Sequence, residues 1–237
     1  MATNPLLEGV RPIRSDRAQL PVGDVALEVL IVEPEEGGPW PTILLIHENR
    51  GLVPYMIDVA EALAQTGYRV VAPDLLSRIG GTDRYADDPA SVSARQIATD
   101  IHVADLAAVY DWLVAQSPSV TVVGFCFGGE MGWQLITKRS PRGAVLYYGI
   151  GPDAEGTALI RTAVYAVYAQ DDPRVNDTLP ELADPLAGAG IDYILESYPG
   201  TKHAFHDHSR QDRYHEGAAS VVWHQTLAFL EDAAREP

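Results

Sequence analysis

Hydrophobic residues gather along the chain in short runs, and longer stretches with helical spacing separate these runs. Residues 42–46, 68–72 and 120–123 are mostly apolar. Runs of this length are typical of strands that are buried on both faces of a parallel sheet. The same pattern predicts three more strands, at residues 144–148, 163–169 and 193–198.

Between the predicted strands, apolar residues recur every three or four positions, as they do on the buried face of a helix. Ile57, Ala60 and Leu63 mark a helix at residues 54–65. Gly67 is suited to end that helix, because glycine accepts a left-handed backbone. By the same spacing we expect helices at about residues 93–115, 130–138, 179–187 and 216–233.

The N-terminal part of the chain has a different pattern. Residues 10–33 alternate loosely between apolar and polar, with a turn at Pro21-Val22-Gly23-Asp24, and this predicts an antiparallel hairpin at the edge of a sheet. Beyond the hairpin, strands and helices alternate, so we expect an α/β fold with a mainly parallel, doubly wound sheet. No linker interrupts the pattern, and we expect a single domain over residues 1–237. Residues 75–92 predict a long loop.

Charge and cysteine content narrow the possible partners. The formal net charge of the 237 residues is −16, which argues against nucleic-acid binding because phosphates are held by concentrated Lys and Arg. The single cysteine excludes an internal disulfide. Residues 1–20 lack the apolar core of a secretion signal, and no run reaches the length of a membrane span. We therefore expect a cytoplasmic protein with neither nucleic acid nor a membrane as partner.

The single cysteine lies in Gly124-Phe125-Cys126-Phe127-Gly128, between a predicted strand and a predicted helix. This Gly-x-Nuc-x-Gly pattern is typical of a nucleophile elbow, with sulfur where most elbows carry a serine oxygen. The glycines allow a tight bend, and the N-terminus of the following helix favours thiolate over thiol. The alternative for this pentapeptide alone is a buried, inert cysteine.

A thiol nucleophile needs a base, and the base needs a group that orients it. His203 is well placed, since it follows the last predicted strand and a Pro199-Gly200 turn that predicts a loop. Asp172 follows the preceding strand, and Asp171 is the competing acid, which spacing alone does not exclude. The carboxyl ends of parallel strands meet at one edge of a sheet, so nucleophile, acid and histidine are expected to converge there.

Two other kinds of site have weaker support in the sequence. His203, His206, His208 and His215 could be read as a metal cluster, but their spacing matches no established ligand pattern. The glycines around Cys126 lack the Lys-Ser/Thr of a phosphate-binding loop and the spacing of a dinucleotide site. We therefore expect neither a metal nor a cofactor.

With these residues in view, the chain resembles the dienelactone hydrolase (carboxymethylenebutenolidase) family of α/β-hydrolases over roughly residues 20–232. The resemblance rests on six blocks, which occur in the family's order: His47-Glu48-Asn49-Arg50-Gly51-Leu52, Ala72-Pro73-Asp74-Leu75, Gly124-Phe125-Cys126-Phe127-Gly128-Gly129, Tyr147-Tyr148-Gly149, Asp172-Pro173-Arg174-Val175-Asn176 and Pro199-Gly200-Thr201-Lys202-His203-Ala204-Phe205.

The resemblance implies a triad of Cys126, Asp172 and His203, and its Asp-x-Arg-Val-Asn block favours Asp172 over Asp171. It further implies that Glu48 contacts the cysteine and governs its ionisation, and that the backbone amides of Phe127 and Asn49 form the oxyanion hole. A carboxylate beside the sulfur would hold the thiol protonated until substrate arrives. The alternative for Glu48 is a salt bridge to Arg50.

The activity that the resemblance implies is hydrolysis of a small-molecule ester or lactone through an acyl-enzyme thioester, by a monomer or homodimer. Substrate contacts are expected from Arg78, Tyr85, Tyr147 and Phe205. Members that cleave dienelactone hold the substrate carboxylate with two arginines, and this chain has Asp207 where the second is expected. A general carboxylesterase or thioesterase, and a non-catalytic binding protein on the same scaffold, are the alternatives.

Overall fold

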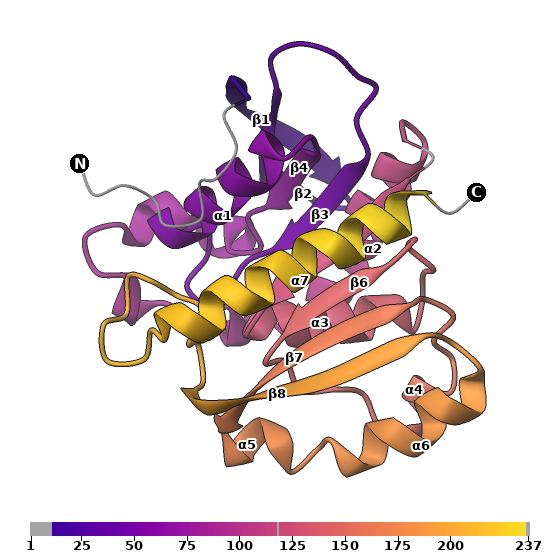
Figure 1. The fold of residues 1–237 in the computed structure, drawn as a ribbon. Coiled ribbons are helices and arrows are strands. Elements are labelled where there is room, and N and C mark those ends of the chain that lie inside the picture. Colours follow the sequence, from indigo (N-terminus) through magenta and orange to yellow (C-terminus); the bar gives the residue numbers. More distant parts are fainter. Residues whose placement is uncertain (1–10, 118, 236–237) are drawn as a thin grey trace. The chain divides into compact units, whose positions relative to one another are not determined.

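The computed structural model describes residues 11–117 and 119–235. The chain divides into two compact units, the first ending at Val120 and the second beginning at Thr121. In each unit, four strands are associated with helices (Figure 1). The expectation of a single domain over residues 1–237 stays a prediction.

The first unit contains the predicted hairpin. Strands β1 (Ile13–Val22) and β2 (Val25–Pro34) pair antiparallel around a turn at Gly23 and Asp24. Strand β4 (Arg69–Pro73) lies antiparallel to β2, and β3 (Thr42–Ile46) lies parallel to β4. Every residue of β3 is buried, as its unbroken apolar sequence predicts.

The helices of the first unit differ in how well their ends were predicted. Helix α1 (Pro54–Gln65) has the predicted bounds, with Pro54 in its first turn and Gly67 at a φ of 108° just beyond its end. Helix α2 (Thr99–Val114) begins later than the predicted residue 93. The Ser93 hydroxyl accepts a hydrogen bond from the Arg95 backbone and starts a separate short turn, so the prediction of one helix from 93 was wrong.

The predicted loop at residues 75–92 is largely folded into short 3-10 helices. These are η1 (Ser77–Ile79), η2 (Thr82–Tyr85) and η3 (Pro89–Ser91), and η4 (Ala94–Gln96) follows. Gly80 and Gly81, which separate η1 from η2, both have positive φ. Local turns therefore provide hydrogen-bond partners for many backbone N–H and C=O groups in a segment that has no apolar periodicity.

The second unit is a parallel sheet in the order β5-β6-β7-β8, flanked by helices. Its strands are β5 (Val120–Phe125), β6 (Ala144–Tyr147), β7 (Val164–Asp171) and β8 (Tyr193–Lys202). Its helices are α3 (Phe127–Ile136), α4 (Ala154–Thr157), α5 (Pro173–Asn176), α6 (Pro180–Ala189) and α7 (Glu216–Arg235). The two four-residue helices, α4 and α5, were not predicted.

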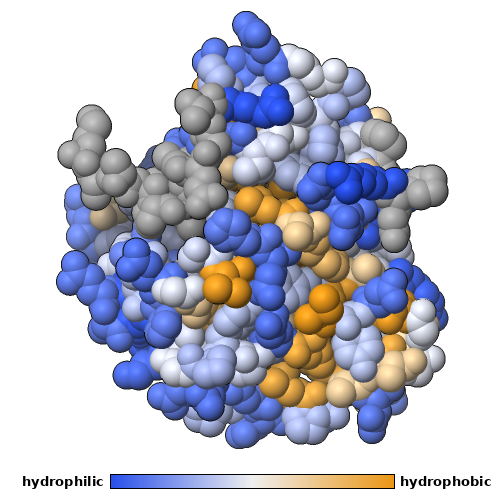
Figure 2. Space-filling model, viewed as in Figure 1, coloured by the Kyte–Doolittle hydropathy of each residue, from blue (hydrophilic) through white to orange (hydrophobic). Residues whose placement is uncertain are grey.

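The C-terminal helix α7 lies beside β6 in Figure 1 and runs in roughly the direction of the strands of the second unit. It is tied to the sheet by polar as well as apolar contacts, since Thr226 on α7 and the Tyr147 hydroxyl on β6 lie 2.6 Å apart. Figure 2 shows polar residues over much of the same face and a hydrophobic patch beside α7. Exposed apolar side chains of this unit include Ile194 on β8 and Val221 on α7.

Strand β8 differs most from its prediction. The strand was expected to end at residue 198, with a loop at Pro199-Gly200, but it continues to Lys202. Gly200 has a φ of 71°, which lets the chain bulge and rejoin the sheet instead of leaving it. The register with β7 shifts at this point, between Ala169 and Asp171.

Candidate active site

Cys126 lies at a sharp turn between β5 and α3, as the elbow pattern predicts. Its φ of 56° and ψ of −110° are unusual for a residue with a side chain, and such backbone conformations persist only where the surrounding structure fixes them. The Cys126 backbone N–H donates to the Tyr147 carbonyl (3.0 Å), and its carbonyl accepts from the Glu130 N–H (3.1 Å). These bonds hold the elbow, and Cys126 as a residue is partly exposed.

The glycines of the elbow are required by close backbone contacts. A Cβ placed on Gly124 would lie 2.2 Å from the Gly128 carbonyl oxygen. A Cβ on Gly129 would lie 2.5 Å from the Tyr147 carbonyl oxygen. Both distances are shorter than real Cβ contacts, so the elbow block cannot accept larger residues at these positions without movement of the backbone.

The structure brings the predicted nucleophile, histidine and acid together within the second unit. His203 Nε2 lies 3.0 Å from Cys126 Sγ, and His203 Nδ1 donates to Asp172 Oδ2 at 2.5 Å. The three residues follow three different strands, β5, β7 and β8. Asp172 is buried, whereas 17% of the His203 side chain is exposed. The geometry is that of a nucleophile, a base and a group that orients the base.

His203 is electrostatically different from an ordinary histidine. Burial alone would lower its pKa, but hydrogen bonds to Asp172 and Cys126, with the attraction of their charges, outweigh burial and raise the pKa of His203 to about 9. The ring also lies against Tyr148, with 4.9 Å between the ring centroids. The environment therefore favours the protonated imidazole that general acid catalysis requires.

Glu48 and Asn49 belong to the first unit, in the turn that follows β3. The Glu48 carboxylate accepts the Arg50 backbone N–H at 2.8 Å, a contact with the Arg50 main chain. The Asn49 side-chain oxygen accepts from the Ser93 hydroxyl (2.7 Å), and the Asn49 carbonyl accepts from the Ala94 N–H (2.8 Å). The roles of Glu48 and of the Asn49 amide, like that of the Phe127 amide, stay predictions.

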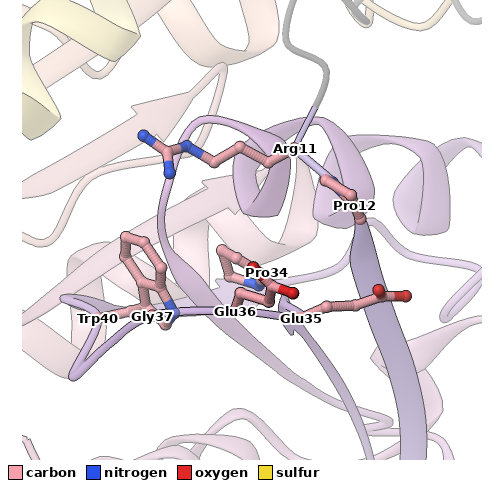
Figure 3. A pocket seen from close by; sticks show the side chains of 7 residues that line it. All are labelled: Arg11, Pro12, Pro34, Glu35, Glu36, Gly37 and Trp40. Carbon is pink, nitrogen blue, oxygen red and sulfur yellow. The ribbon is translucent and has the colours of Figure 1, made fainter.

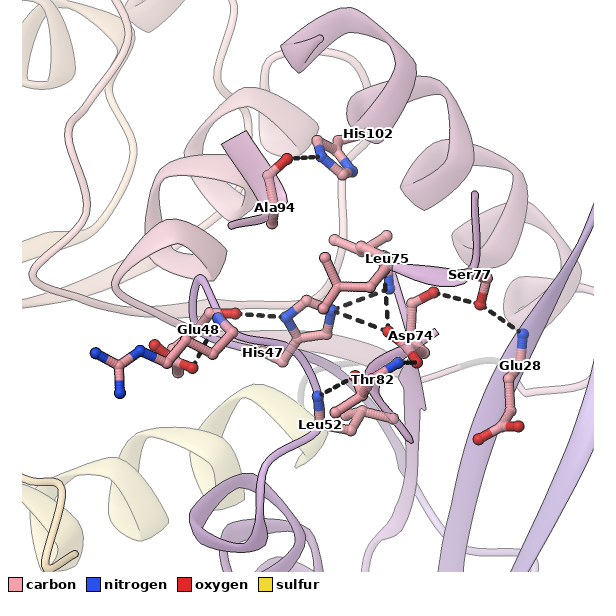
Figure 4. A network of polar contacts seen from close by, with 12 residues as sticks. Glu28, His47, Glu48, Leu52, Asp74, Leu75, Ser77, Thr82, Ala94 and His102 are labelled. Carbon is pink, nitrogen blue, oxygen red and sulfur yellow. Dashed lines mark hydrogen bonds and ion pairs between the residues drawn. The ribbon is translucent and has the colours of Figure 1, made fainter. Parts of the chain in front are cut away.

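His47 is at the centre of a polar network in the same turn (Figure 4). His47 Nδ1 donates to the Glu48 carbonyl (2.6 Å), and Nε2 accepts the Leu75 backbone N–H (2.9 Å). The nearby Asp74 carboxylate accepts the backbone N–H groups of Leu76 and Thr82. These bonds fix the turn that carries Glu48, and burial lowers the pKa of His47, which is therefore neutral.

Arg78, expected to contact substrate, is held by carboxylates of its own unit. Its Nε and Nη2 donate to the two oxygens of Asp105, at 2.8 and 2.9 Å, and its Nη1 donates to Asp24 at 3.0 Å. Asp105 is buried. All three guanidinium nitrogens are thus engaged, and hydrogen bonds to these carboxylates are the main cause that raises the pKa of Arg78.

The three aromatic residues predicted to contact substrate lie in different surroundings. The Tyr85 hydroxyl donates to the Ile79 carbonyl (3.0 Å) in the first unit. Tyr147 is fully buried in the second unit, where its hydroxyl meets Thr226. Phe205 is also fully buried, and its ring packs near Tyr148. Their predicted contacts with substrate stay predictions.

The histidines considered as a metal cluster have other surroundings. His206 is buried against the rings of Phe125, Tyr147 and Trp223, and burial lowers its pKa to about 3. His215 Nδ1 accepts a backbone N–H at the start of α7. Within residues 11–117 and 119–235, no three His, Cys, Asp or Glu side chains form a group that could hold a metal ion.

A surface pocket in the first unit has a volume of about 480 Å³ and none of the predicted site residues line it (Figure 3). Its walls include Arg11, Glu35, Glu36 and Trp40. The Arg11 guanidinium lies over the Trp40 ring, 5.4 Å from its centroid. The size of a cavity is therefore a poor guide to the chemistry of this chain, which we infer from the triad.

The fold is that of α/β-hydrolases, as solved structures show. A candidate dienelactone hydrolase from Klebsiella pneumoniae has a TM-score of 0.80 and 24% identity, over 92% of this chain and 98% of that one. Brefeldin A esterase, described as a bacterial homologue of human hormone-sensitive lipase, has a TM-score of 0.73 and 13% identity, over 96% and 79% of the two chains. The predicted fold class, with its antiparallel edge hairpin, is confirmed.

Sequence comparison identifies the family. Residues 27–234 match the dienelactone hydrolase family, and the chain belongs to it. A candidate carboxymethylenebutenolidase of Saccharolobus solfataricus is 26% identical over 86% of this chain and 93% of its own length. The predicted resemblance is confirmed, and the protein is a hydrolase. No helix in the described part of the chain is both long and apolar enough to span a membrane.

Proposed function

We propose that the protein hydrolyses small esters or lactones with Cys126 as nucleophile, through an acyl-enzyme thioester. The observation that carries the proposal is the continuous contact from Cys126 Sγ to His203 Nε2 and from His203 Nδ1 to Asp172 Oδ2, at 3.0 and 2.5 Å. Membership of the dienelactone hydrolase family supports it.

In the first half-reaction, the Cys126 sulfur attacks the carbonyl carbon of the substrate, and His203 Nε2 receives the thiol proton. As the tetrahedral intermediate collapses, the C–O bond breaks and the imidazolium gives that proton to the departing oxygen. Asp172 keeps a proton on Nδ1, so Nε2 is the nitrogen that exchanges a proton with the sulfur, and the negative charge of Asp172 stabilises the imidazolium. The product is a thioester on Cys126; an ester releases its alcohol at this step, whereas the hydroxyl group of an opened lactone stays on the acyl chain.

In the second half-reaction, His203 Nε2 removes a proton from water, and the hydroxide attacks the thioester carbon. The C–S bond breaks, the sulfur recovers its proton from His203, and the carboxylic acid leaves. The predicted oxyanion donors, the amides of Phe127 and Asn49, would stabilise both tetrahedral intermediates. Their assignment, like that of Glu48 as a control on sulfur ionisation, rests on the family resemblance.

The surroundings of Arg78 favour substrates without a carboxylate. Its three guanidinium nitrogens are already bonded to Asp105 and Asp24. The second position at which a carboxylate-binding arginine is expected holds Asp207, whose own carboxylate accepts from Ser209. A substrate anion would have to compete with the buried Asp105 carboxylate and the exposed Asp24 carboxylate for Arg78, so we expect neutral esters and lactones to react faster than dienelactone.

A substrate panel with one nucleophile variant tests the proposal. Wild type should hydrolyse p-nitrophenyl acetate and a neutral butyrolactone with a higher kcat/KM than dienelactone, and an acyl thioester separates thioesterase activity from both. Cys126→Ala should lose hydrolysis of every substrate. Full hydrolysis by Cys126→Ala would refute the nucleophile, and a preference for dienelactone would refute only the choice of neutral substrates.

A further inference from the structure

The strands that carry Asp172 and His203 fall out of register directly before the triad. Strands β7 and β8 pair residue for residue from Val164 and Tyr193 to Ala169 and Tyr198, and pairing resumes at Asp171 and Lys202. The single residue Gln170 on β7 therefore lies opposite three residues on β8, at 199–201. The bulge inserts two extra residues into β8.

These two residues decide which side chain meets the acid. If the register continued unbroken from Ala169 and Tyr198, Asp172 would stand beside Thr201. With the bulge, Lys202 pairs with Asp171, and the next residue, His203, stands beside Asp172. Bulges next to active sites commonly re-aim side chains in this way. The contact between His203 and Asp172 thus depends on the bulge keeping its shape.

The bulge is held by contacts between the two strands, in which Gln170 and Thr201 form what we term the clasp. The Gln170 side-chain oxygen accepts the Gly200 backbone N–H at 2.8 Å, in place of a sheet partner. The Gln170 backbone N–H donates to the Thr201 hydroxyl oxygen at 3.4 Å, and that hydroxyl donates to the Tyr198 carbonyl at 2.6 Å. Gly200 supplies the left-handed backbone that the bulge requires, and a Cβ there would meet open space.

A further side chain fixes the acid side of the clasp. Asn176 on α5 donates to the carbonyls of Ala169 (2.9 Å) and Gln170 (3.1 Å). Its backbone N–H also donates to the Asp172 carbonyl at 2.9 Å. The end of β7 is therefore anchored independently, and the clasp ties the end of β8 to it. Thr201 is buried with 1% of its surface exposed, whereas Gln170 is exposed.

We propose that Gln170 and Thr201 are positioning residues for catalysis, which hold the bulge in β8 so that the His203 ring stays between Asp172 and Cys126. The inference rests on the proposed function of this triad. Neither side chain touches the reacting atoms. Loss of the clasp lets the histidine loop move relative to the acid, and a small displacement of a catalytic base lowers kcat while substrate binding is preserved.

The first test compares kcat and KM of clasp variants. Gln170→Ala should lower kcat about tenfold and leave KM within about twofold, and because Gln170 is exposed the fold is not at risk. Thr201→Val should have a similar effect, and Thr201→Ser, which keeps the hydroxyl, should restore kcat. The matched control is Thr178→Val, since the Thr178 hydroxyl also donates to the carbonyl three residues earlier (Val175, 2.7 Å) and lies outside the clasp.

The second test asks whether the clasp acts through the His203–Asp172 pair. In an Asp172→Asn background, Gln170→Ala should cause no further loss of kcat. In Gln170→Ala alone, the NMR titration of the His203 imidazole, identified by its absence in His203→Gln, should move towards that of an ordinary histidine. A further loss of kcat in the Asp172→Asn background would show that Gln170 does not act through this pair, and a role of Gln170 in stability alone would leave the His203 titration unchanged.

The outcomes separate this inference from the proposed function. If Gln170→Ala and Thr201→Val both keep kcat within about twofold of wild type while Cys126→Ala is inactive, the clasp is not a positioning device and the nucleophile assignment stands. If Cys126→Ala keeps full activity, the proposed function fails and this inference fails with it.

Discussion

Two histidines of this chain follow strands and lie near aspartates, yet their surroundings give them different properties. His47, after β3 in the first unit, has Nε2 3.9 Å from Asp74 Oδ1. His203, after β8 in the second unit, has Nδ1 2.5 Å from Asp172 Oδ2. Burial lowers the pKa of His47, whereas the pKa of His203 is raised to about 9.

The difference lies in what each nitrogen and each carboxylate already binds. Both ring nitrogens of His47 are bonded to main-chain groups, those of Glu48 and Leu75. The Asp74 carboxylate accepts two backbone N–H groups, those of Leu76 and Thr82, so it stabilises the loop rather than a proton on the His47 ring. In His203, by contrast, Nδ1 is bonded to the Asp172 carboxylate and Nε2 contacts the Cys126 sulfur. A nearby carboxylate is therefore common to both histidines, and only His203 has the direct carboxylate bond and the thiol contact that our proposed mechanism requires of its base.

The largest expected effect is on activity, and we expect it when His203, rather than His47, is replaced. His203→Ala should lower kcat for ester hydrolysis by about 10³-fold or more, because both the base and the acid of the reaction are lost. The melting temperature should also fall, because the buried Asp172 carboxylate loses its partner, so kcat is measured at a temperature where the variant is folded. Steady-state kinetics and thermal unfolding measure the two quantities. A variant that retains wild-type kcat would remove His203 from the mechanism.

The ion pair between Arg78 and Asp105 in the first unit offers a second comparison, between a charge that stabilises the fold and one that is proposed to act in catalysis. Arg78→Met leaves the buried Asp105 carboxylate without its bidentate partner. The free energy of unfolding should fall by about 3 kcal/mol, because an uncompensated buried charge is costly. Urea denaturation measures the change. Arg84→Met on the same segment serves as control, because Arg84 is exposed and its Nη1 donates to the Ile79 carbonyl. An Arg78→Met protein that is as stable as the control but cannot bind anionic esters would instead support substrate binding by Arg78.

His47→Ala is expected to act on stability. The variant leaves the Leu75 backbone N–H buried without its acceptor, so the free energy of unfolding should fall by about 2 kcal/mol. His224→Ala is a suitable control, because His224 is exposed and its Nδ1 donates to the Ser220 carbonyl. If His47→Ala unfolds at the same urea concentration as this control, the polar network does not stabilise the turn.

The smallest effects are opposite slopes of stability with pH. The pKa of His203 in the fold lies above the unfolded value of 6.5, so its contribution to stability is complete below pH 6.5 and is lost as pH rises towards about 9. The pKa of His47 is lowered, so its contribution is complete above pH 6.5 and is lost on acidification. Burial also lowers the pKa values of His102 and His206, which therefore add to the loss of stability on acidification.

Asp172→Asn should flatten the alkaline slope alone, since it removes a partner that raises the pKa of His203. His47→Gln should reduce only the acid slope. Urea unfolding at a series of pH values from about 5 to about 9 measures both slopes, because this range brackets the ordinary pKa of histidine. An alkaline slope that is unchanged in Asp172→Asn would show that the His203–Asp172 bond does not stabilise the fold.

The parts of this molecule that could be predicted from sequence are those with a local signal. The unbroken apolar run of β3, the periodic α1 and the glycines around Cys126 each specify their own structure. Chain order and strand ends then place Cys126, Asp172 and His203 at one edge of the second sheet. The triad could be found because the topology of a parallel sheet converts sequence order into proximity.

What could not be predicted depends on contacts between distant residues. Pro199-Gly200 is locally a turn signal, and it becomes a bulge within β8 because Gln170, about thirty residues earlier, accepts the Gly200 N–H. Arg78 was expected to face substrate, and the sequence gives no sign that Asp105 binds it, because a helix presents that aspartate from another part of the chain. Likewise, Ser93 starts a separate turn before α2, which shortens the helix that periodicity alone predicts.

The central claim is that the Cys126 sulfur carries the acyl group during turnover. Protein quenched in acid during steady-state hydrolysis of p-nitrophenyl acetate, then digested and mapped by mass spectrometry, tests it directly. We predict one acetyl group, on the peptide that contains Cys126. When a reactive thioester is used as the acetyl donor, we predict a larger fraction of acetylated protein in His203→Gln than in wild type. Turnover at the wild-type rate with the acetyl group on another residue, or with unmodified Cys126 under conditions that trap a thioester in a control cysteine hydrolase, would contradict the account.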